Sequence, residues 1–188
     1  MALFLIESTP GRELDRQAVS AALERAAAAA RERGGDLLEA QVAGDLSRVF
    51  AVLEGPDAET VKQAFRAGGL PVQLIKQVRL VGQDLAEVRK SRDQVDYVVE
   101  WNLPANLTME AYLERKKANS PRYAEVPEVR FLRTYVCEDM TKCVCFYDAA
   151  ELEDVLRARQ AVQAPVDAVS RVSPGPVAPA DADQGAAR

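Results

Sequence analysis

This 188-residue sequence contains no histidine. Imidazole is the commonest general acid–base group and a preferred ligand of zinc, copper and nickel. Its absence excludes the usual forms of such sites, so acid–base catalysis here would depend on carboxylates or tyrosine. Aromatic residues make up only 6% of the chain, and it has one tryptophan and three cysteines.

The sequence also lacks a basic excess and a long hydrophobic run. Its net charge is −5 and its pI is near 5.0, whereas nucleic-acid binders usually carry a basic patch. No run approaches the roughly 18 apolar residues of a membrane span. The start, MALFLIESTP, has no basic n-region and reaches Glu7 too early for a signal peptide. With an odd cysteine count, we expect a cytoplasmic protein that binds neither nucleic acid nor membrane.

One spacing, 94 residues, recurs along the chain. Pairs of identical residues at this spacing include Pro10 and Pro104, Leu38 and Leu132, Val42 and Val136, Asp45 and Asp139, Glu59 and Glu153, Val61 and Val155, Ala64 and Ala158, Pro71 and Pro165, Val78 and Val172. Because the spacing holds without a gap, it predicts two diverged copies of one unit.

Each half shows a β-α-β-β-α-β pattern, which is the order of a ferredoxin-like unit. The first half alternates predicted strands and helices over 2–8, 13–33, 37–43, 47–54, 58–68 and 72–80. The second half does so over 96–101, 108–119, 129–136, 143–148, 151–162 and 166–172. We therefore expect repeat 1 over 1–82, a polar linker over 83–94, repeat 2 over 95–172 and a disordered Pro/Ala/Asp-rich tail over 173–188.

Three stretches of the second half carry a family resemblance: YVVEWNLPANLT, VRFLRTYV and CVCFYDAAELEDV. They resemble a bacterial domain family of unknown function, whose described actinobacterial member is a nickel-binding protein with a dimeric ferredoxin-like fold. The resemblance covers residues 96–172 and, more weakly, residues 3–80. It implies a ferredoxin-like α+β fold and a divalent metal, nickel, as the possible cofactor; no other cofactor is indicated.

Alternation along the strands predicts two faces for each sheet. In the first half Leu38, Ala40 and Val42, with Val72 and Leu74, form an apolar face that should meet the helices. The opposite faces mix polar residues with Leu5, Leu37, Ile75, Val98, Phe131 and Val169. Two such half-apolar faces predict that the repeats pack sheet to sheet as an intramolecular, pseudo-dimeric α+β barrel. The alternative is that these faces are solvated.

The polar residues of these faces are the candidate ligand-binding set. They are Glu100, Arg133, Tyr135, Asp167 and Arg171 in the second half and Glu7, Glu39 and Gln41 in the first. Buried charges need partners, so we expect Glu100 to pair with Arg133 and Asp167 with Arg171. Glu100, Arg133, Tyr135 and Arg171 should be buried. Guanidinium groups match carboxylates, which favours a small anionic ligand over a bare cation.

All three cysteines lie in CEDMTKCVC, as Cys137, Cys143 and Cys145. Cys143 and Cys145 should project from one face of a strand, about 7 Å apart, which is wide for two ligands of one metal ion. Cys137 opposes Cys143 only if the turn has five residues, and a four-residue turn sends the two to opposite faces. Two interpretations stay open: small packing residues, or a soft-metal or redox site.

Two classes of function fit these observations. The first is a non-catalytic protein, monomeric or homodimeric, that binds a small molecule or metal ion between the repeats. The second is a cofactor-independent monooxygenase- or isomerase-like enzyme that uses Glu100, Asp167 or Tyr135. The absence of a clear general base favours the binding protein.

Overall fold

The computed structural model describes residues 1–91 and 93–175, which divide into two compact units. Unit 1 contains residues 1–76, 85–91 and 174–175, and unit 2 contains residues 77–84 and 93–173. None of the helices in the described residues is long and apolar enough to cross a membrane.

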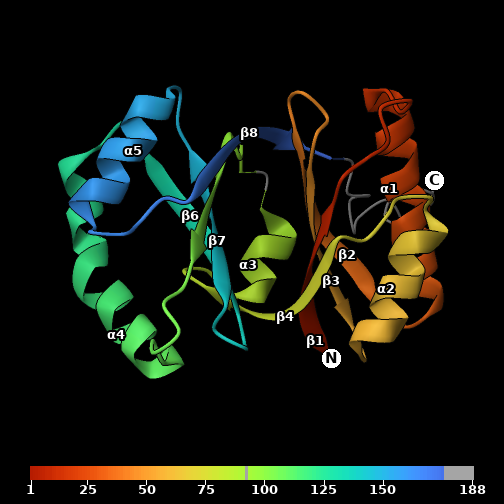
Figure 1. Ribbon diagram of the computed structural model, residues 1–188, viewed down its shortest axis with the longest axis horizontal. Helices are drawn as coiled ribbons and strands as arrows, with labels where there is room; N and C mark the ends of the chain where they lie inside the picture. The colour runs from red at the N-terminus through yellow and green to blue at the C-terminus, as the bar shows by residue number, and fades with distance from the viewer. Residues whose placement is uncertain (92, 176–188) are drawn as a thin grey trace, which may run out of the picture. The chain divides into compact units, whose positions relative to one another are not determined.

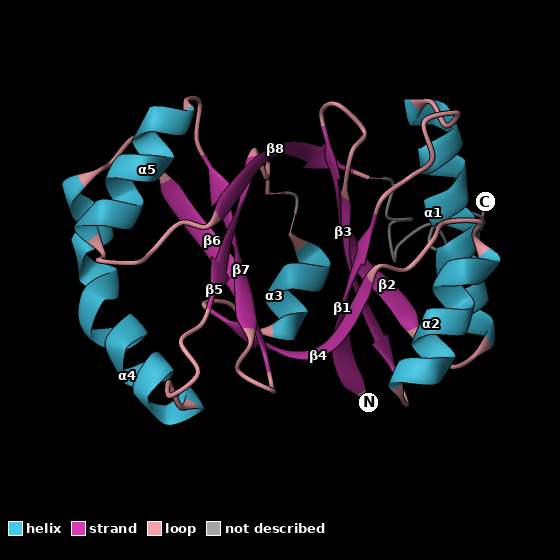
Figure 2. Cartoon of the chain, viewed as in Figure 1, coloured by secondary structure: helices cyan, strands magenta, loops and turns pink. Residues whose placement is uncertain are grey.

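Unit 1 is an antiparallel sheet with two helices on one face (Figures 1 and 2). Its elements are β1 (Ala2–Ser8), α1 (Arg16–Glu32), β2 (Asp36–Ala43), β3 (Val49–Gly55), α2 (Ala58–Ala67) and α3 (Leu85–Lys90). β3 pairs with both β1 and β2. The helix α3 lies inside the segment that the sequence predicts to be a polar linker.

Unit 2 repeats this plan. Its elements are β5 (Tyr97–Asn102), α4 (Met109–Asn119), the short 3₁₀ helix η1 (Ser120–Glu125), β6 (Arg130–Cys137), β7 (Lys142–Asp148) and α5 (Leu152–Ala161). β7 pairs antiparallel with β5 and β6. α4 and α5 cover one face of this sheet (Figure 2).

Two further strands, β4 (Leu74–Val81) and β8 (Ala168–Pro174), contribute to both units. In unit 1, the Gln73 amide before β4 donates to the Glu7 carbonyl; in unit 2, the end of β4 pairs with β6. β8 pairs with β5 in unit 2, and Gly175 then donates to Ala40 of β2 in unit 1. Both units combine antiparallel strands with helices, so the α+β class is confirmed.

The finer parts of the predicted fold stay predictions. They are the packing of the two sheets face to face and the limits of the two repeats. Of the predicted disordered tail, Ser173 and Pro174 belong to β8, and residues 176–188 lie outside the described residues.

The core of unit 1 is closely packed and apolar. Alanines of α1 lie against α2, where a side chain at Gly68 would overlap the Ala22 carbonyl. Under the helices, β2 and β3 contribute Ala40, Ala51 and Leu53, all at most 1% exposed. Small residues at these positions let the helices approach the sheet closely and fill the space with hydrocarbon.

A β-bulge in each unit changes the predicted faces. The register shifts between Leu37 and Glu39 in β2 and between Phe131 and Arg133 in β6. An extra residue in one strand reverses the alternation beyond it. Leu37, rather than Leu38, therefore packs in the unit 1 core, and Phe131 packs on the helix side of unit 2. The predictions for these three residues are wrong for this reason.

The faces predicted for the start of β4 are also wrong. Ile75, rather than Leu74, packs against the unit 1 core together with Val72. The strand begins only at Leu74, so strict alternation does not reach back to Val72.

The 94-residue spacing extends to the backbone geometry. Both bulges fall at positions related by it. Residues with positive φ also occur in such pairs: Leu46 (62°) with Met140 (57°), and Gly69 (94°) with Gln163 (56°). Side-chain to backbone bonds match as well, because Asp45 accepts from the Ser47 amide and Asp139 from the Thr141 amide.

Candidate functional site

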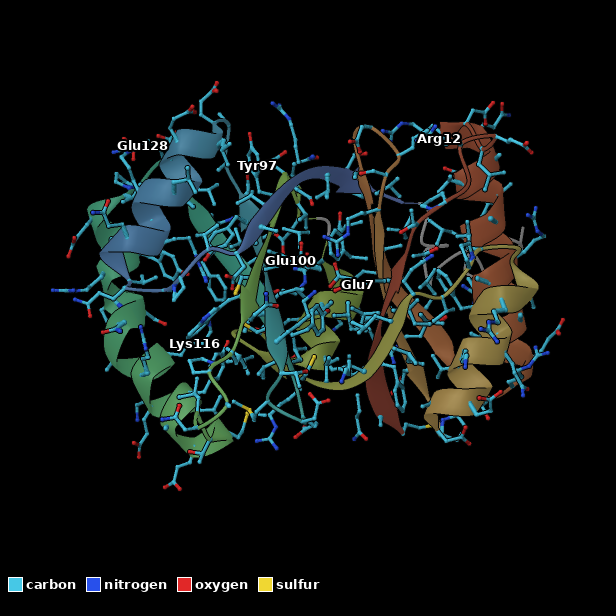
Figure 3. The ribbon with its side chains drawn as sticks, in the orientation of Figure 1. Glu7, Arg12, Tyr97, Glu100, Lys116 and Glu128 are labelled. Carbon is cyan, nitrogen blue, oxygen red and sulfur yellow. The ribbon has the colours of Figure 1, made fainter. Side chains whose placement is uncertain are left out.

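Three residues of the predicted ligand set are buried in unit 2. Glu100, Arg133 and Tyr135 are 5%, 3% and 0% exposed, which confirms their predicted burial. Glu100 on β5 (Figure 3) accepts a hydrogen bond of 2.7 Å from the Lys142 ammonium. Arg133 donates to Gln83 Oε1 at 3.1 Å, and its Nη1 lies 3.6 Å from Asp93 Oδ2.

The sequence missed these partners because strand neighbours cannot be read from it directly. β7 lies between β5 and β6. Glu100 of β5 is the cross-strand neighbour of Val144 on β7, whereas Arg133 of β6 is the neighbour of Phe146 on β7. The two predicted partners are therefore on different rows of the sheet.

The remaining two residues of the second half are exposed. Arg171 was expected to be buried, and that prediction is wrong. Its guanidinium lies 5.8 Å from the centre of the Tyr97 ring. Asp167 accepts a hydrogen bond of 2.6 Å from the Asn102 amide, so the predicted Asp167–Arg171 pair is replaced by these contacts.

In unit 1, Glu7 pairs with Arg48 at 2.7 Å, and Gln41 donates to Glu39 at 3.2 Å. Glu39 and Gln41 are 6% and 3% exposed. By strand register, Glu7–Arg48 is the counterpart of the Glu100–Lys142 pair in unit 2. These ion pairs account for part of the polar set structurally, and a ligand-binding role for the set stays a prediction.

A cavity of about 30 Å³ lies on the other side of the unit 2 sheet, under α4, η1 and α5. We call it the helix-side pocket. It is lined by Trp101, Tyr112, Arg115, Lys116, Asn119, Ser120, Tyr123, Cys145, Arg159, Val162 and Ala164. Three of these side chains are cationic and none is a carboxylate.

The floor of the pocket is formed by β7. Its alternation places Cys143, Cys145 and Tyr147 on the helix side, as predicted for the two cysteines. Cys143 lies opposite Val136, so the turn has four residues and Cys137 points to the other face. Thr134 on β6 is the cross-strand partner of Cys145, with 3.0 Å between its hydroxyl oxygen and the sulfur.

Arg159 comes from the buried stripe of α5, which it shares with Val155 and Ala158. It is only 2% exposed. Its Nη1 donates to the Cys145 sulfur at 3.4 Å and to the Tyr147 hydroxyl at 3.2 Å, and Nη2 donates to the Pro165 carbonyl at 2.5 Å. Its Nε is buried with no hydrogen-bond partner in the described part of the chain.

Thr134, Cys145, Tyr147 and Arg159 form what we call the polar cluster. Each is at most 2% exposed. A guanidinium group removed from water needs a compensating negative charge. Within residues 1–91 and 93–175 no carboxylate contacts Arg159, so the thiol of Cys145 is the acidic group placed to supply that charge.

The wall of the pocket is aromatic and cationic. Tyr123 of η1 stacks on Phe131, with 5.2 Å between ring centres, and its hydroxyl lies 2.7 Å from that of Tyr147. The ammonium group of Lys116 (labelled in Figure 3) lies 4.2 Å from the centre of the Phe131 ring. The β-bulge in β6 places Phe131 on the helix side of the sheet, and this position allows Phe131 to stack on Tyr123.

The electrostatics favour a thiolate at Cys145. The hydrogen bond with Cys143 lowers the pKa of Cys145 well below its ordinary value, although burial acts in the other direction. The positive charges of Arg159 and Lys116 lower this pKa further. The same hydrogen bond and burial raise the pKa of Cys143, so Cys145 is the more acidic thiol of the pair.

Two phenols stay neutral: Tyr147 of the polar cluster and Tyr123 of the pocket wall. Burial raises the pKa of Tyr147 to about 12, and burial also raises the pKa of Tyr123. For Arg159, burial acts to lower the pKa, but the nearby sulfur and the Tyr147 hydroxyl outweigh it and the pKa is raised. The resulting arrangement is a buried guanidinium beside a thiol of lowered pKa, with hydroxyl groups around both.

Sequence reasoning missed Arg159 and treated Cys145 mainly as a packing residue. Arg159 occupies a helix position where the pattern of Val155, Ala158 and Val162 predicts an apolar residue. The 94-residue spacing carries a usable signal, because the counterpart of Arg159 is Phe65. An arginine in place of a buried phenylalanine indicates a polar interior at that point.

The nickel implied by the family resemblance does not fit the described residues. Nickel prefers imidazole and other nitrogen or sulfur ligands arranged around one point. The chain has no histidine, and residues 1–91 and 93–175 contain no cluster of three or more cysteines and carboxylates that could hold a metal ion. Cys137 lies on the opposite face from Cys143, so the three sulfurs do not converge.

Residues 97–172 match the family described as "Nickel responsive protein SCO4226-like", and this confirms the resemblance seen in the sequence. The match coincides with the segment that holds β5 to β8 and the polar cluster. No curated protein matches this chain.

Solved structures resemble nearly the whole chain. A candidate chlorite dismutase has a TM-score of 0.59 at 9% identity, covering 92% of this chain and 95% of its own. A candidate monooxygenase from Fusobacterium nucleatum has a TM-score of 0.52 at 9% identity, covering 93% and 92%. Another candidate monooxygenase, from Lactobacillus acidophilus, has a TM-score of 0.52 at 10% identity, and the match covers 95% of this chain and 97% of the other. At these identities the likeness shows a shared fold and no shared activity.

Proposed function

We propose that this protein binds a small anion in the helix-side pocket of unit 2. The observation that carries this proposal is the lining: Arg115, Lys116 and Arg159 supply positive charge, and no carboxylate lines the cavity. Even with Cys145 ionised, the cations outnumber the anions. Arg159 Nε is buried and has no hydrogen-bond partner in the described residues, so the protein does not satisfy this guanidinium completely.

Neither of the other two cations is neutralised by an acidic side chain of the described residues. Arg115 donates to the Gln163 carbonyl and lies over Trp101, with 5.4 Å from its guanidinium carbon to the ring centre. Lys116 lies over Phe131. Cations held against aromatic rings keep their charge available to an incoming anion.

The size of the cavity limits the ligand. A water molecule needs at least about 10–15 Å³ of such space, so about 30 Å³ holds roughly two waters. This volume suits an anion of three or four heavy atoms, or the anionic end of a larger molecule. The sequence analysis also predicted a small anionic ligand, but it placed the binding site on the opposite faces of the sheets.

We further infer that the two units are diverged copies of one ferredoxin-like ancestor. The bulges, the positive-φ residues and the capped turns that recur with one spacing support this inference. The cofactor-independent enzyme considered from the sequence is supported by likeness of fold alone.

The proposal is tested by thermal unfolding in nitrate, formate or acetate, each exchanged against chloride at constant ionic strength. A ligand at 100 times its Kd stabilises by about 2.7 kcal/mol, which raises Tm by roughly 5–10 °C in a chain of this size. We expect at least one of these anions to raise the Tm of the wild type in this way.

The variant Arg159→Met should remove that rise, and Lys116→Met should weaken it. The matched control is Arg157→Met, because Arg157 is on the same helix but is exposed and paired with Asp154. An unchanged Tm of the wild type with all three anions, or an equal rise in Arg159→Met, would contradict the proposal.

A further inference from the structure

We propose that Cys145 is a reactive thiolate that hydrogen peroxide oxidises to a sulfenic acid inside the helix-side pocket. This inference concerns the same pocket as the proposed anion binding, and it adds a covalent reaction to it. It rests on the contact of Arg159 with the sulfur, on the position of Cys145 in the cavity lining and on the size of that cavity.

The neighbour of the sulfur that favours a thiolate is a cation. The Arg159 guanidinium contacts the sulfur at 3.4 Å, whereas the Thr134 hydroxyl, 3.0 Å away, donates its proton to the Val144 carbonyl. Thiolates next to cations are the nucleophilic form of cysteine, and they are the form that peroxides oxidise. By contrast, burial and the hydrogen bond with Cys145 keep Cys143 protonated, since they raise its pKa.

Access to the sulfur runs through the pocket. Cys145 is only 1% exposed, yet it lines the cavity. Hydrogen peroxide is an uncharged molecule with two oxygen atoms, so it needs about the space of two waters, which is what the cavity offers. Larger alkylating reagents should reach the sulfur poorly.

The reaction balances within the pocket. The Cys145 thiolate attacks one peroxide oxygen, so that an S–O bond forms and the O–O bond breaks. Sulfur is oxidised by two electrons and the peroxide is reduced. The other oxygen leaves as hydroxide and takes a proton from solvent to become water. The Arg159 guanidinium, whose Nη1 lies 3.4 Å from the sulfur, places a positive charge beside the negative charge that develops on this oxygen.

The product should be a sulfenic acid and not a Cys143–Cys145 disulfide. The two residues lie two apart on one strand, where same-face positions are about 6.5–7 Å apart. Disulfides usually have Cα separations of about 4.4–6.8 Å, with most near 5.5–6 Å, so this pair lies at the upper end of the range and closure would require the strand to bend. Reduction back to the thiol therefore uses an external small thiol, first as a mixed disulfide and then by exchange with a second thiol molecule.

The experiment treats the folded full-length protein with one equivalent of hydrogen peroxide, removes the peroxide, and then unfolds the protein in guanidinium chloride that contains a 1,3-diketone reagent to trap sulfenic acid. Peptide mass mapping should place the trapped group on Cys145, and without the trap the intact mass should rise by about 16 Da for one oxygen. A subsequent excess of dithiothreitol should restore the starting mass.

Variants make the result specific. Arg159→Met should slow trapping about ten- to hundredfold, the range of one charge-assisted hydrogen bond, while Arg157→Met reacts as the wild type does. Cys143→Ser should still be trapped at Cys145. The site is read from wild-type peptides, so it does not depend on the folding of any Cys145 variant.

Trapping on Cys137 or Cys143 in place of Cys145, or an unchanged rate in Arg159→Met, would overturn the inference. So would the absence of trapping while the wild type still shows its anion-dependent rise in Tm, and in that case the proposed anion binding would stand. Trapping at Cys145 without any anion-dependent rise would reject the anion binding alone.

Discussion

Equivalent positions under the helices of the two units hold different chemistry. In unit 1 they are Ala40, Ala51, Leu53 and Phe65, all at most 1% exposed. Ninety-four residues later, in unit 2, they are Thr134, Cys145, Tyr147 and Arg159. The strand pairs, bulges and turns around these positions correspond, so the two cores differ in side chains and not in backbone plan.

This difference indicates what the polar cluster is for. Unit 1 shows that an apolar interior is sufficient for this backbone plan. Buried ion pairs are seldom more stabilising than the hydrocarbon that could replace them. The polar cluster is therefore better explained by binding and reactivity than by folding, and the family match covers the unit that contains it.

The largest expected effect comes from placing an arginine in the apolar core. Phe65→Arg should lower the free energy of unfolding by about 4 kcal/mol or more, because Ala40, Ala51 and Leu53 stand where unit 2 has its hydroxyl and thiol groups and offer none to the buried charge. Urea unfolding measures this effect, and Phe65→Leu is the control for the loss of the ring. A loss no larger than that of Phe65→Leu would show that unit 1 can hold the charge and that the two cores are not different in kind.

A smaller effect should appear in the pH dependence of stability. The pKa of Cys145 is lowered, so between that value and the ordinary thiol pKa of about 8.5 the unfolded chain holds a proton that the folded chain lacks. Stability should then rise with pH by up to about 1.4 kcal/mol per unit in that window, and the contribution is lost as pH falls through the folded pKa.

Cys145→Ala, which introduces the unit 1 residue, should remove this rise, and Cys137→Ala should keep it. The groups that set the charge at the sulfur are Arg159, Lys116 and Cys143, and the raised pKa of Cys143 acts only above the window. If the free energy of unfolding changes with pH equally in the wild type and in Cys145→Ala, the Cys145 thiol is protonated in the folded protein.

The smallest effect concerns a position where the units should behave alike. Gln163 has a φ of 56° after α5, where unit 1 has Gly69 after α2. Because left-handed backbone is strained for residues with a Cβ, Gln163→Gly should raise the free energy of unfolding by up to about 1 kcal/mol. Gly69→Gln should lower it by a similar amount. Opposite signs would show that the two helix ends are not equivalent.

The sequence predicted the order of strands and helices well because period-2 and period-3.6 patterns report directly on burial. It could not predict the bulges, since an added strand residue leaves the composition unchanged while reversing the face of Leu37 and Phe131. Nor did it predict α3, whose segment has too few apolar residues to indicate packing.

The site was less predictable than the fold. The burial of Glu100, Arg133 and Tyr135 followed from alternation, but their partners depend on strand order. The polar cluster was missed because Arg159 interrupts an apolar helix stripe and was not compared with Phe65. A substitution of this kind is visible only when the two halves are aligned residue by residue.

The central claim is that the polar cluster makes the helix-side pocket a functional site. Its most direct test is a variant that gives unit 2 the unit 1 residues at all four positions: Thr134→Ala, Cys145→Ala, Tyr147→Leu and Arg159→Phe. The thermal unfolding of this variant and of the wild type would be compared in nitrate, formate, acetate and chloride. The account predicts a folded variant, by circular dichroism, whose Tm no longer depends on the anion. A folded variant that keeps the wild-type rise in Tm would contradict it.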